Sequence, residues 1–128
     1  MNDIQLRYAS VEYKEPIVYL RFKNDVVLGA KEVLEIGEAG DKLCNHKPRL
    51  ILTDARVPVD ITKQGREVSS IPENYANVIA NAVVVKWLAQ RLIANVFMEV
   101  NKPPYPMRVF TDEKKAVNWL LEQQKKVN

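Results

Sequence analysis

Two residues with reactive side chains stand close together near the middle of the chain. Cys44 and His46 are the only cysteine and the only histidine among its 128 residues. A thiol beside an imidazole can form the nucleophile–base pair of an enzyme. Residues two apart on a helix point in different directions, however. We therefore expect Cys44 to pack as a small hydrophobic residue and His46 to interact with the negative end of a helix.

The sequence lacks the usual patterns of sites that bind metals or phosphates. A structural zinc site takes about four Cys or His ligands, and this chain offers two. Neither of the glycine-rich phosphate-binding motifs, GxGxxG and GxxxxGK[ST], occurs. Glu32, Glu35, Glu38 and Asp41 recur on one side of a helical pattern and are most simply a solvated face. We expect no metal, no cofactor and no enzymatic activity, with paired carboxylates left open as an alternative.

Asp54 is the polar residue best placed for a binding role. It follows the apolar run Leu-Ile-Leu-Thr, at the end of an expected strand. Ligand sites of α/β sheets lie at the carboxyl ends of strands. With Arg56, Asp54 could line a small anionic or polar site. Alternatively, its carboxylate accepts hydrogen bonds from backbone amides and shapes the loop.

The proline-rich segment Asn-Lys-Pro-Pro-Tyr-Pro allows two interpretations. Tyr105, flanked by Lys102 and Arg108, could present a rigid secondary recognition surface. The alternative is structural, because prolines restrict the unfolded chain and set the entry into the next strand. We favour the structural interpretation.

Composition excludes several classes of protein. Hydrophobic residues make up 47% of the chain, charged residues 27%, and the net charge is only +3. Because the charges are interspersed, no basic stripe of a nucleic-acid-binding protein is seen. The single cysteine excludes an internal disulfide, and no apolar run approaches the ~20 residues of a membrane span or resembles a signal peptide. We expect one cytoplasmic domain over residues 1–128.

The hydrophobic pattern predicts nine elements in an alternating order. Strands are expected where residues alternate or form short apolar runs, and helices where apolar residues recur with a period near 3.6. The order is β-β-α-β-α-β-α-β-α, over residues 4–13, 17–22, 30–47, 49–53, 60–71, 78–86, 87–100, 107–110 and 111–126. This order predicts an α/β fold with a mixed, mostly parallel sheet and four helices.

The order of elements resembles the STAS fold of sulfate transporters and anti-sigma factor antagonists such as SpoIIAA. A more specific resemblance covers residues 95–120, NVFMEVNKPPYPMRVFTDEKKAVNWL, which are similar to a small bacterial STAS-like group without an established activity. In the antagonists, an Asp-Ser-Ser-Gly motif at a helix start carries a serine that is phosphorylated. The resemblance places this motif on Thr62, Lys63, Gln64 and Gly65.

Lysine and glutamine therefore stand at the two serine positions. Lys63 has no hydroxyl to phosphorylate, and its charge is opposite in sign to that of phosphate. The resemblance thus implies a STAS-like protein without the phosphorylation switch of its relatives. Thr62 could still accept phosphate, but a threonine at a helix start is usually an N-cap, and we expect that role.

Two functions follow from the resemblance. The first is a non-catalytic regulatory or interaction protein that binds a protein partner or a second copy of itself as a homodimer. Its binding surface would comprise Asp54, Arg56, Thr62, Lys63 and Arg66. The second is a small-molecule or lipid-binding protein, in which the apolar helix over residues 88–100 forms the wall of a pocket beside the sheet.

Overall fold

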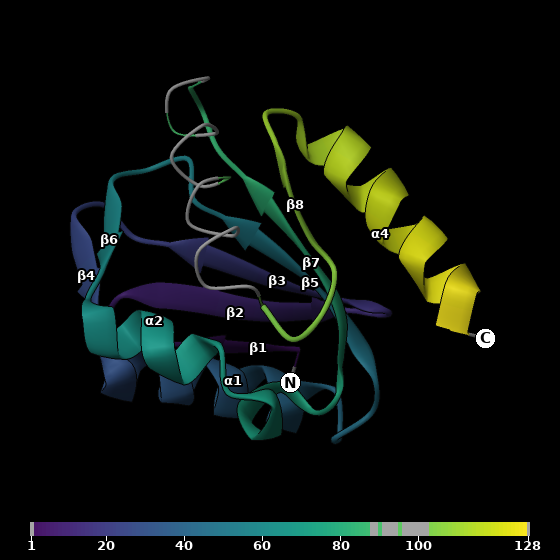
Figure 1. The fold of residues 1–128 in the computed structure, drawn as a ribbon, viewed down its shortest axis with the longest axis horizontal. Coiled ribbons are helices and arrows are strands. Elements are labelled where there is room, and N and C mark those ends of the chain that lie inside the picture. The colour runs from purple at the N-terminus through teal and green to yellow at the C-terminus, as the bar shows by residue number, and fades with distance from the viewer. Residues whose placement is uncertain (1, 88–89, 91–94, 96–102, 128) are drawn as a thin grey trace.

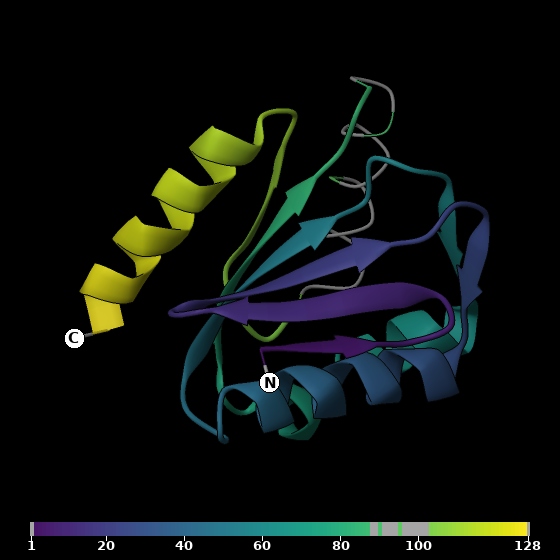
Figure 2. The same cartoon turned by 180° about the vertical axis from the view of Figure 1, so that it is seen from behind.

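The segments with strand periodicity pair into one large sheet with helices on both sides (Figures 1 and 2). The computed structural model describes residues 2–87, 90, 95 and 103–127. The elements are β1 (Asp3–Gln5), β2 (Ala9–Lys14), β3 (Ile17–Phe22), β4 (Val26–Leu28), α1 (Ala30–Leu43), β5 (Arg49–Asp54), β6 (Val59–Ile61), α2 (Lys63–Ser69), the 3₁₀ helix η1 (Pro72–Tyr75), β7 (Val78–Val84), β8 (Met107–Phe110) and α4 (Glu113–Val127).

The large sheet has six strands in the order β1-β2-β3-β5-β7-β8. The first three strands are antiparallel, and β3, β5, β7 and β8 are parallel. This mixed, mostly parallel α/β sheet confirms the expected fold class. Because the parallel strands share one direction, the carboxyl ends of β3, β5 and β7 meet at one edge.

Each face of the sheet carries its own hydrophobic core, because successive side chains of a strand point to opposite faces. Leu50, Leu52 and Ala82 face α4 and are fully buried there, together with Ala116 and Leu120 of that helix. The other core lies between β2, β3 and α1. Figures 1 and 2 show α1 and α2 on one side of the sheet and α4 on the other.

The N-terminal region differs from the expected hairpin. The alternating stretch over residues 4–13 is two antiparallel strands, β1 and β2, and the backbone N–H of Leu6 donates to the carbonyl of Ala9 in the turn between them. A period of two cannot distinguish one long strand from two short ones whose turn preserves the alternation. The expected turn at Asn24-Asp25 is confirmed, and Asp25 has a positive φ of 58°.

Two short strands and one 3₁₀ helix were not expected from the sequence. β4 and β6 form a separate parallel pair, in which Val27 lies opposite Asp60. Each strand has only three residues, too few to show a period. Together they connect the large sheet to the starts of α1 and α2.

The helices begin and end near the expected residues. α1 stops at Leu43, four residues before the predicted end, because Asn45 and His46 adopt positive φ values. α4 starts at Glu113, and the Asp112 carboxylate accepts hydrogen bonds from the first-turn amides. The described residues contain three α-helices. The fourth expected helix, over residues 87–100, lies largely outside the described residues.

The core beneath α4 can be tested by comparing neighbouring leucines on that helix. Leu120 is fully buried, whereas Leu121 is 36% exposed. We expect Leu120→Ala to lower the free energy of unfolding by about 2–5 kcal/mol, because it opens a cavity against the sheet. Leu121→Ala should cost less than about 1 kcal/mol. Urea denaturation measures both values, and equal losses would contradict the packing of α4.

Candidate functional site

Four charged side chains form a closed network at the carboxyl edge of the sheet. Arg21 of β3 lies opposite Asp54 of β5 in the strand register, and its Nη1 donates to the Asp54 carboxylate at 2.7 Å. The same nitrogen donates to Glu113 of α4 at 2.9 Å. Arg56 donates to Asp54 through Nε and Nη2, both at 2.9 Å, and to Glu113 at 2.8 Å. Two arginines therefore balance two carboxylates.

The network keeps both carboxylates ionised. Burial alone would raise the pKa of Asp54. Hydrogen bonds from Arg56 and Arg21 outweigh this effect and lower the pKa to about 2. Hydrogen bonding from Arg21 likewise lowers the pKa of Glu113. Because each charge already has an opposite charge in contact, Asp54 and Arg56 are poorly suited to act as a receptor for an external anion. Their geometry agrees better with a structural role in the loop after β5.

The loop after β5 alternates between two environments. Arg56 points towards Asp54 and Glu113, while Ala55 and Val57 on either side of it line a cavity on the opposite face of the sheet. The backbone N–H of Arg56 also donates to the Asp54 carboxylate at 3.2 Å. The charged network thus orients the rim of this cavity.

The remaining residues of the predicted binding surface lie at the start of α2. Thr62 is the N-cap, as expected, and its hydroxyl oxygen accepts a hydrogen bond from the backbone N–H of Gly65 at 3.0 Å. Lys63 is exposed. Arg66 donates to the Ile61 carbonyl at 3.0 Å and lines the cavity. No hydrogen bond or ion pair found within the described residues joins this group to Asp54 and Arg56.

Gly65, which the resemblance aligned with the glycine of the STAS antagonists' motif, has a packing role. A Cβ atom at this position would lie 2.8 Å from the carbonyl oxygen of Leu28 and 2.9 Å from the Ile61 side chain. Any side chain would therefore collide with the end of β4 or with β6. The glycine allows α2 to start directly against these strands.

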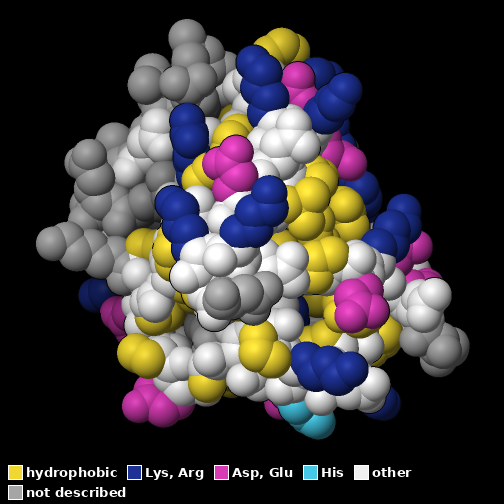
Figure 3. Space-filling view, turned by 90° about the vertical axis from the view of Figure 1, so that its right-hand side faces the viewer, with side chains coloured by type: hydrophobic (Ala, Val, Ile, Leu, Met, Phe, Trp, Pro, Cys, Tyr) yellow, Lys and Arg dark blue, Asp and Glu magenta, His cyan; other side chains and the backbone are white. Residues whose placement is uncertain are grey.

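The predicted secondary surface is divided between two sides of the sheet. Tyr105 lines the cavity, whereas Arg108 is exposed on the α4 side, with its guanidinium 5.2 Å from the ring centre of Phe110. Figure 3 faces the α4 side and shows Lys and Arg side chains spread over it, with apolar side chains between them. Lys102 lies outside the described residues. Tyr105 and Arg108 therefore do not share one surface.

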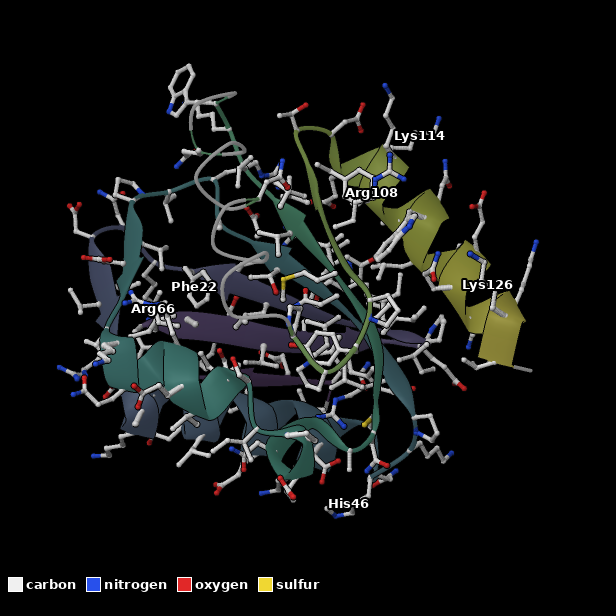
Figure 4. The ribbon with its side chains drawn as sticks, in the orientation of Figure 1. Phe22, His46, Arg66, Arg108, Lys114 and Lys126 are labelled. Atoms are coloured by element: carbon white, nitrogen blue, oxygen red, sulfur yellow. The ribbon has the colours of Figure 1, made fainter. Side chains whose placement is uncertain are left out.

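Cys44 and His46 are also separated. Cys44 is buried, and its Sγ donates to backbone carbonyls of Asp41 and Lys47, which confirms its expected packing role. His46 is exposed at the far end of the molecule (Figure 4), where its Nδ1 contacts the Asp41 carboxylate. It lies beyond the end of α1, which stops at Leu43, and not within the last turn of the helix as the sequence predicted. The imidazole does not face the thiol, so the pair lacks the geometry of a catalytic dyad.

A cavity of about 520 Å³ lies between the sheet and the α1–α2 layer. Its wall on the sheet includes Ile51, Val83 and Val109, which alternate with the residues that face α4. Gly37 and Gly40 of α1 also line it. Packed interiors rarely contain voids larger than a water molecule, and ligand pockets span roughly 300–1,000 Å³. The cavity therefore has the size of a ligand site.

Three polar side chains of the lining form one hydrogen-bonded group beside the sheet. The Thr53 hydroxyl donates to the Asn81 side chain at 2.9 Å, and Asn81 also hydrogen-bonds Tyr105. Burial raises the pKa of the Tyr105 hydroxyl. In Figure 4, Phe22 and Arg66 lie together above the start of α2, and both line the cavity. The polar lining residues are Arg49, Thr53, Asp60, Arg66, Ser69, Ser70, Asn81, Gln90 and Tyr105.

The polar group around Asn81 was not expected from the sequence. Asn81 is 8% exposed in the middle of a strand that otherwise consists of apolar residues. A buried amide needs hydrogen-bond partners, so an asparagine within Val-Ile-Ala-Asn-Ala-Val-Val was a usable indication of a polar site. Its partners Thr53 and Tyr105 are distant in sequence and could not be paired with it before the strand register was known.

The described residues were also examined for metal-ligand groups and for helices that could span a membrane. Within residues 2–87, 90, 95 and 103–127, His, Cys, Asp and Glu side chains form no group of three or more that could hold a metal ion. In the same part of the chain, no helix has the length and apolar character needed to cross a membrane.

Comparison with known proteins gives a family and a fold. The profile of the family "Domain of unknown function (DUF7793)" matches residues 11–124, and it is this family rather than a STAS family that matches. A crystal structure of an uncharacterised DUF3478-family protein with a SpoIIAA-like fold, from Shewanella loihica PV-4, is similar with a TM-score of 0.59. The two chains are 16% identical, over 88% of this chain and 91% of the other, so the similarity shows the fold alone. No curated protein matches.

The charged network predicts a specific pH dependence of stability. The pKa of the Asp54 carboxyl is about 2 in the folded protein, against an ordinary value of 3.8. Its ionisation therefore stabilises the fold above about pH 4. We expect Asp54→Asn to lower the free energy of unfolding at pH 7 by roughly 2 kcal/mol. The difference from wild type should vanish as pH falls from 4 towards 2.

Urea denaturation across this pH range measures the effect. Glu122→Gln, on an exposed position of α4, is the matched control and should change stability by less than about 0.5 kcal/mol at every pH. A difference between wild type and Asp54→Asn that stays constant from pH 7 to pH 2 would contradict the assigned role.

Proposed function

We propose that this chain, which belongs to the DUF7793 family, is a non-catalytic binding protein whose ligand is a small, largely apolar molecule. The ligand would occupy the cavity between the sheet and the α1–α2 layer. The observation that carries this proposal is the cavity's volume of about 520 Å³, together with its mostly apolar wall. Burial of apolar ligand surface there would supply the binding free energy, at roughly 25 cal/mol per Å².

The arrangement of polar groups supports binding rather than catalysis. Asp54 and Glu113 are neutralised by arginines, and the thiol of Cys44 does not face the imidazole of His46. Asp60 is the one carboxylate among the described residues that line the cavity. A few polar side chains in an apolar wall are typical of sites that orient a ligand.

Ligand occupancy can be tested with a pair of valine substitutions. Val83→Trp would fill the cavity from the sheet, whereas Val27→Trp places the same side chain at a position that is 61% exposed. We expect wild type and Val27→Trp to bind the neutral apolar dye Nile red with the same affinity. Val83→Trp should weaken binding at least about tenfold, because the indole occupies the space of the dye.

Dye fluorescence titration measures the affinities, and circular dichroism confirms that each variant is folded. Native mass spectrometry of freshly purified wild type provides a second readout, because a co-purified small molecule would add a defined mass. Equal dye affinity in the folded Val83→Trp and Val27→Trp variants would contradict the proposal.

Docking of a protein partner or a second copy at the start of α2 is a second candidate function. Lys63 and Gln64 are exposed there, and Val27, which lies opposite Asp60 in the β4–β6 pair, is exposed as well. Thr62 already uses its hydroxyl as the N-cap, and Lys63 cannot be phosphorylated. Docking here would therefore act without the phosphorylation switch of the STAS antagonists.

Charge reversal tests this second candidate. We expect Lys63→Glu to reduce capture of a native partner from host lysate while leaving the melting temperature unchanged, because the side chain is exposed. Lys31→Glu, at an exposed position of α1, is the control. Capture that is equal for Lys63→Glu and Lys31→Glu would rule out this surface.

A further inference from the structure

Arg66 lies on the face of α2 that closes the cavity. Ser69 and Ser70, three and four residues further along the chain, line the cavity together with Arg66. Residues at this spacing share one face of a helix. Gln64 and Glu67, which point to other sides of α2, are exposed. Arg66 itself is only partly exposed, so its side chain lies at the rim of the cavity and remains accessible.

The guanidinium of Arg66 is positioned by the protein but not neutralised by it. Its Nη1 donates to the carbonyl oxygen of Ile61 at 3.0 Å. A guanidinium has further N–H donors, and no ion pair found within residues 2–87, 90, 95 and 103–127 involves Arg66. Arg49, the other cation among the described lining residues, already pairs with Asp41 at 2.9 Å. The cation available to a ligand is therefore Arg66.

Asp60, the carboxylate of the described lining, belongs to a strand whose alternate side chains face the core. Val59 and Ile61 on either side of it pack against the core formed with β2, β3 and α1. Because successive side chains of a strand point to opposite faces, the Asp60 side chain points outwards. It is exposed, as is Val27, its register partner in β4. The Asp60 carboxylate is thus directed to solvent and does not balance Arg66.

We propose, on the basis of the proposed function, that the ligand is a single-chain amphiphile whose carboxylate head group binds Arg66 while its apolar chain fills the cavity. A guanidinium and a carboxylate form charge-assisted hydrogen bonds, which are stronger than those between neutral groups. Because Arg66 is partly exposed, the head group would stay in contact with water. The cost of burying an unpaired charge is then avoided. One guanidinium balances a singly charged carboxylate better than a phosphate monoester, which carries more negative charge.

The strand order gives the apolar chain a path across the sheet. Phe22 at the end of β3 lies near Arg66 in Figure 4, and both line the cavity. The next strands are β5, β7 and β8, which contribute Ile51, Val83 and Val109 to the lining. Neighbouring strands are about 4.8 Å apart, so three spacings extend roughly 14 Å from the head group. This wall suits an elongated apolar chain.

Substitutions on α2 separate the head-group contact from general binding in the cavity. Arg66→Gln removes the charge, and Arg66→Glu reverses it. Lys63→Gln is the matched control, because it removes one positive charge from an exposed position of the same helix that is not part of the described lining. Circular dichroism confirms that each variant is folded.

The probes are heptanoate, heptylammonium and 2-heptanone, which share one chain length and carry a negative, a positive and no charge. Displacement of Nile red measures their affinities at pH 7. We expect wild type to bind heptanoate more tightly than heptylammonium. Arg66→Gln should weaken heptanoate about tenfold, the typical effect of losing a hydrogen bond to a charged group, and should change 2-heptanone affinity less than about threefold. Lys63→Gln should leave all affinities near wild type, and Arg66→Glu should prefer heptylammonium to heptanoate.

The outcomes distinguish the two proposals. Failure of both Nile red and 2-heptanone to bind, or binding that Val83→Trp does not reduce, would overturn the proposed function. Three results would overturn only the head-group contact while 2-heptanone still binds in the cavity. These are a wild-type preference for heptylammonium, equal effects of Arg66→Gln on heptanoate and 2-heptanone, and equal weakening of heptanoate by Lys63→Gln and Arg66→Gln. Tighter binding of heptyl phosphate than of heptanoate would overturn the assignment of a carboxylate.

Discussion

Successive side chains of β5 and β7 point to opposite faces of the sheet, and the two faces are filled to different extents. On the face towards α4, Leu50, Leu52 and Val84 are fully buried against that helix. On the other face, Ile51, Thr53 and Val83 border a cavity instead of a complete core. The strand period makes this difference possible, because one face can be optimised for packing while the other is free to hold a ligand.

The ends of the strands connect the two faces. Arg21 bonds both Asp54 and Glu113, the first residue of α4, so the charged network holds α4 at the carboxyl edge of the sheet. The next residues of the loop, Ala55 and Val57, are on the cavity side. A single loop therefore joins the stable core to the rim of the cavity. Asp54 and Arg56 therefore act through contacts within the protein, which hold this loop against α4.

The sequence predicted those features that depend on local pattern. The apolar run of β5, the amphipathic α4, the N-cap at Thr62 and the packing of Cys44 were all recognisable within a few residues. The SpoIIAA-like fold was also recognisable, from the order of these elements.

The sequence could not predict features that depend on distant residues meeting. Arg21 and Glu113 are 92 positions apart, and their contact requires both the strand register and the position of α4. The ion pair between Arg49 and Asp41 depends on where α1 lies relative to β5. β4 and β6 were missed because three residues show no period. The Asn81 amide could have indicated the cavity, but only through its burial.

The central claim is that an apolar ligand occupies the cavity on the α1–α2 side of the sheet. Methyl NMR spectra recorded during a titration with 2-heptanone test it most directly. The methyl signals of Ile51, Val83 and Val109 should shift together and saturate, while those of Leu50, Leu52 and Leu120 on the opposite face remain in place. Saturable shifts confined to the α4 face, or no saturable shifts at all, would contradict it.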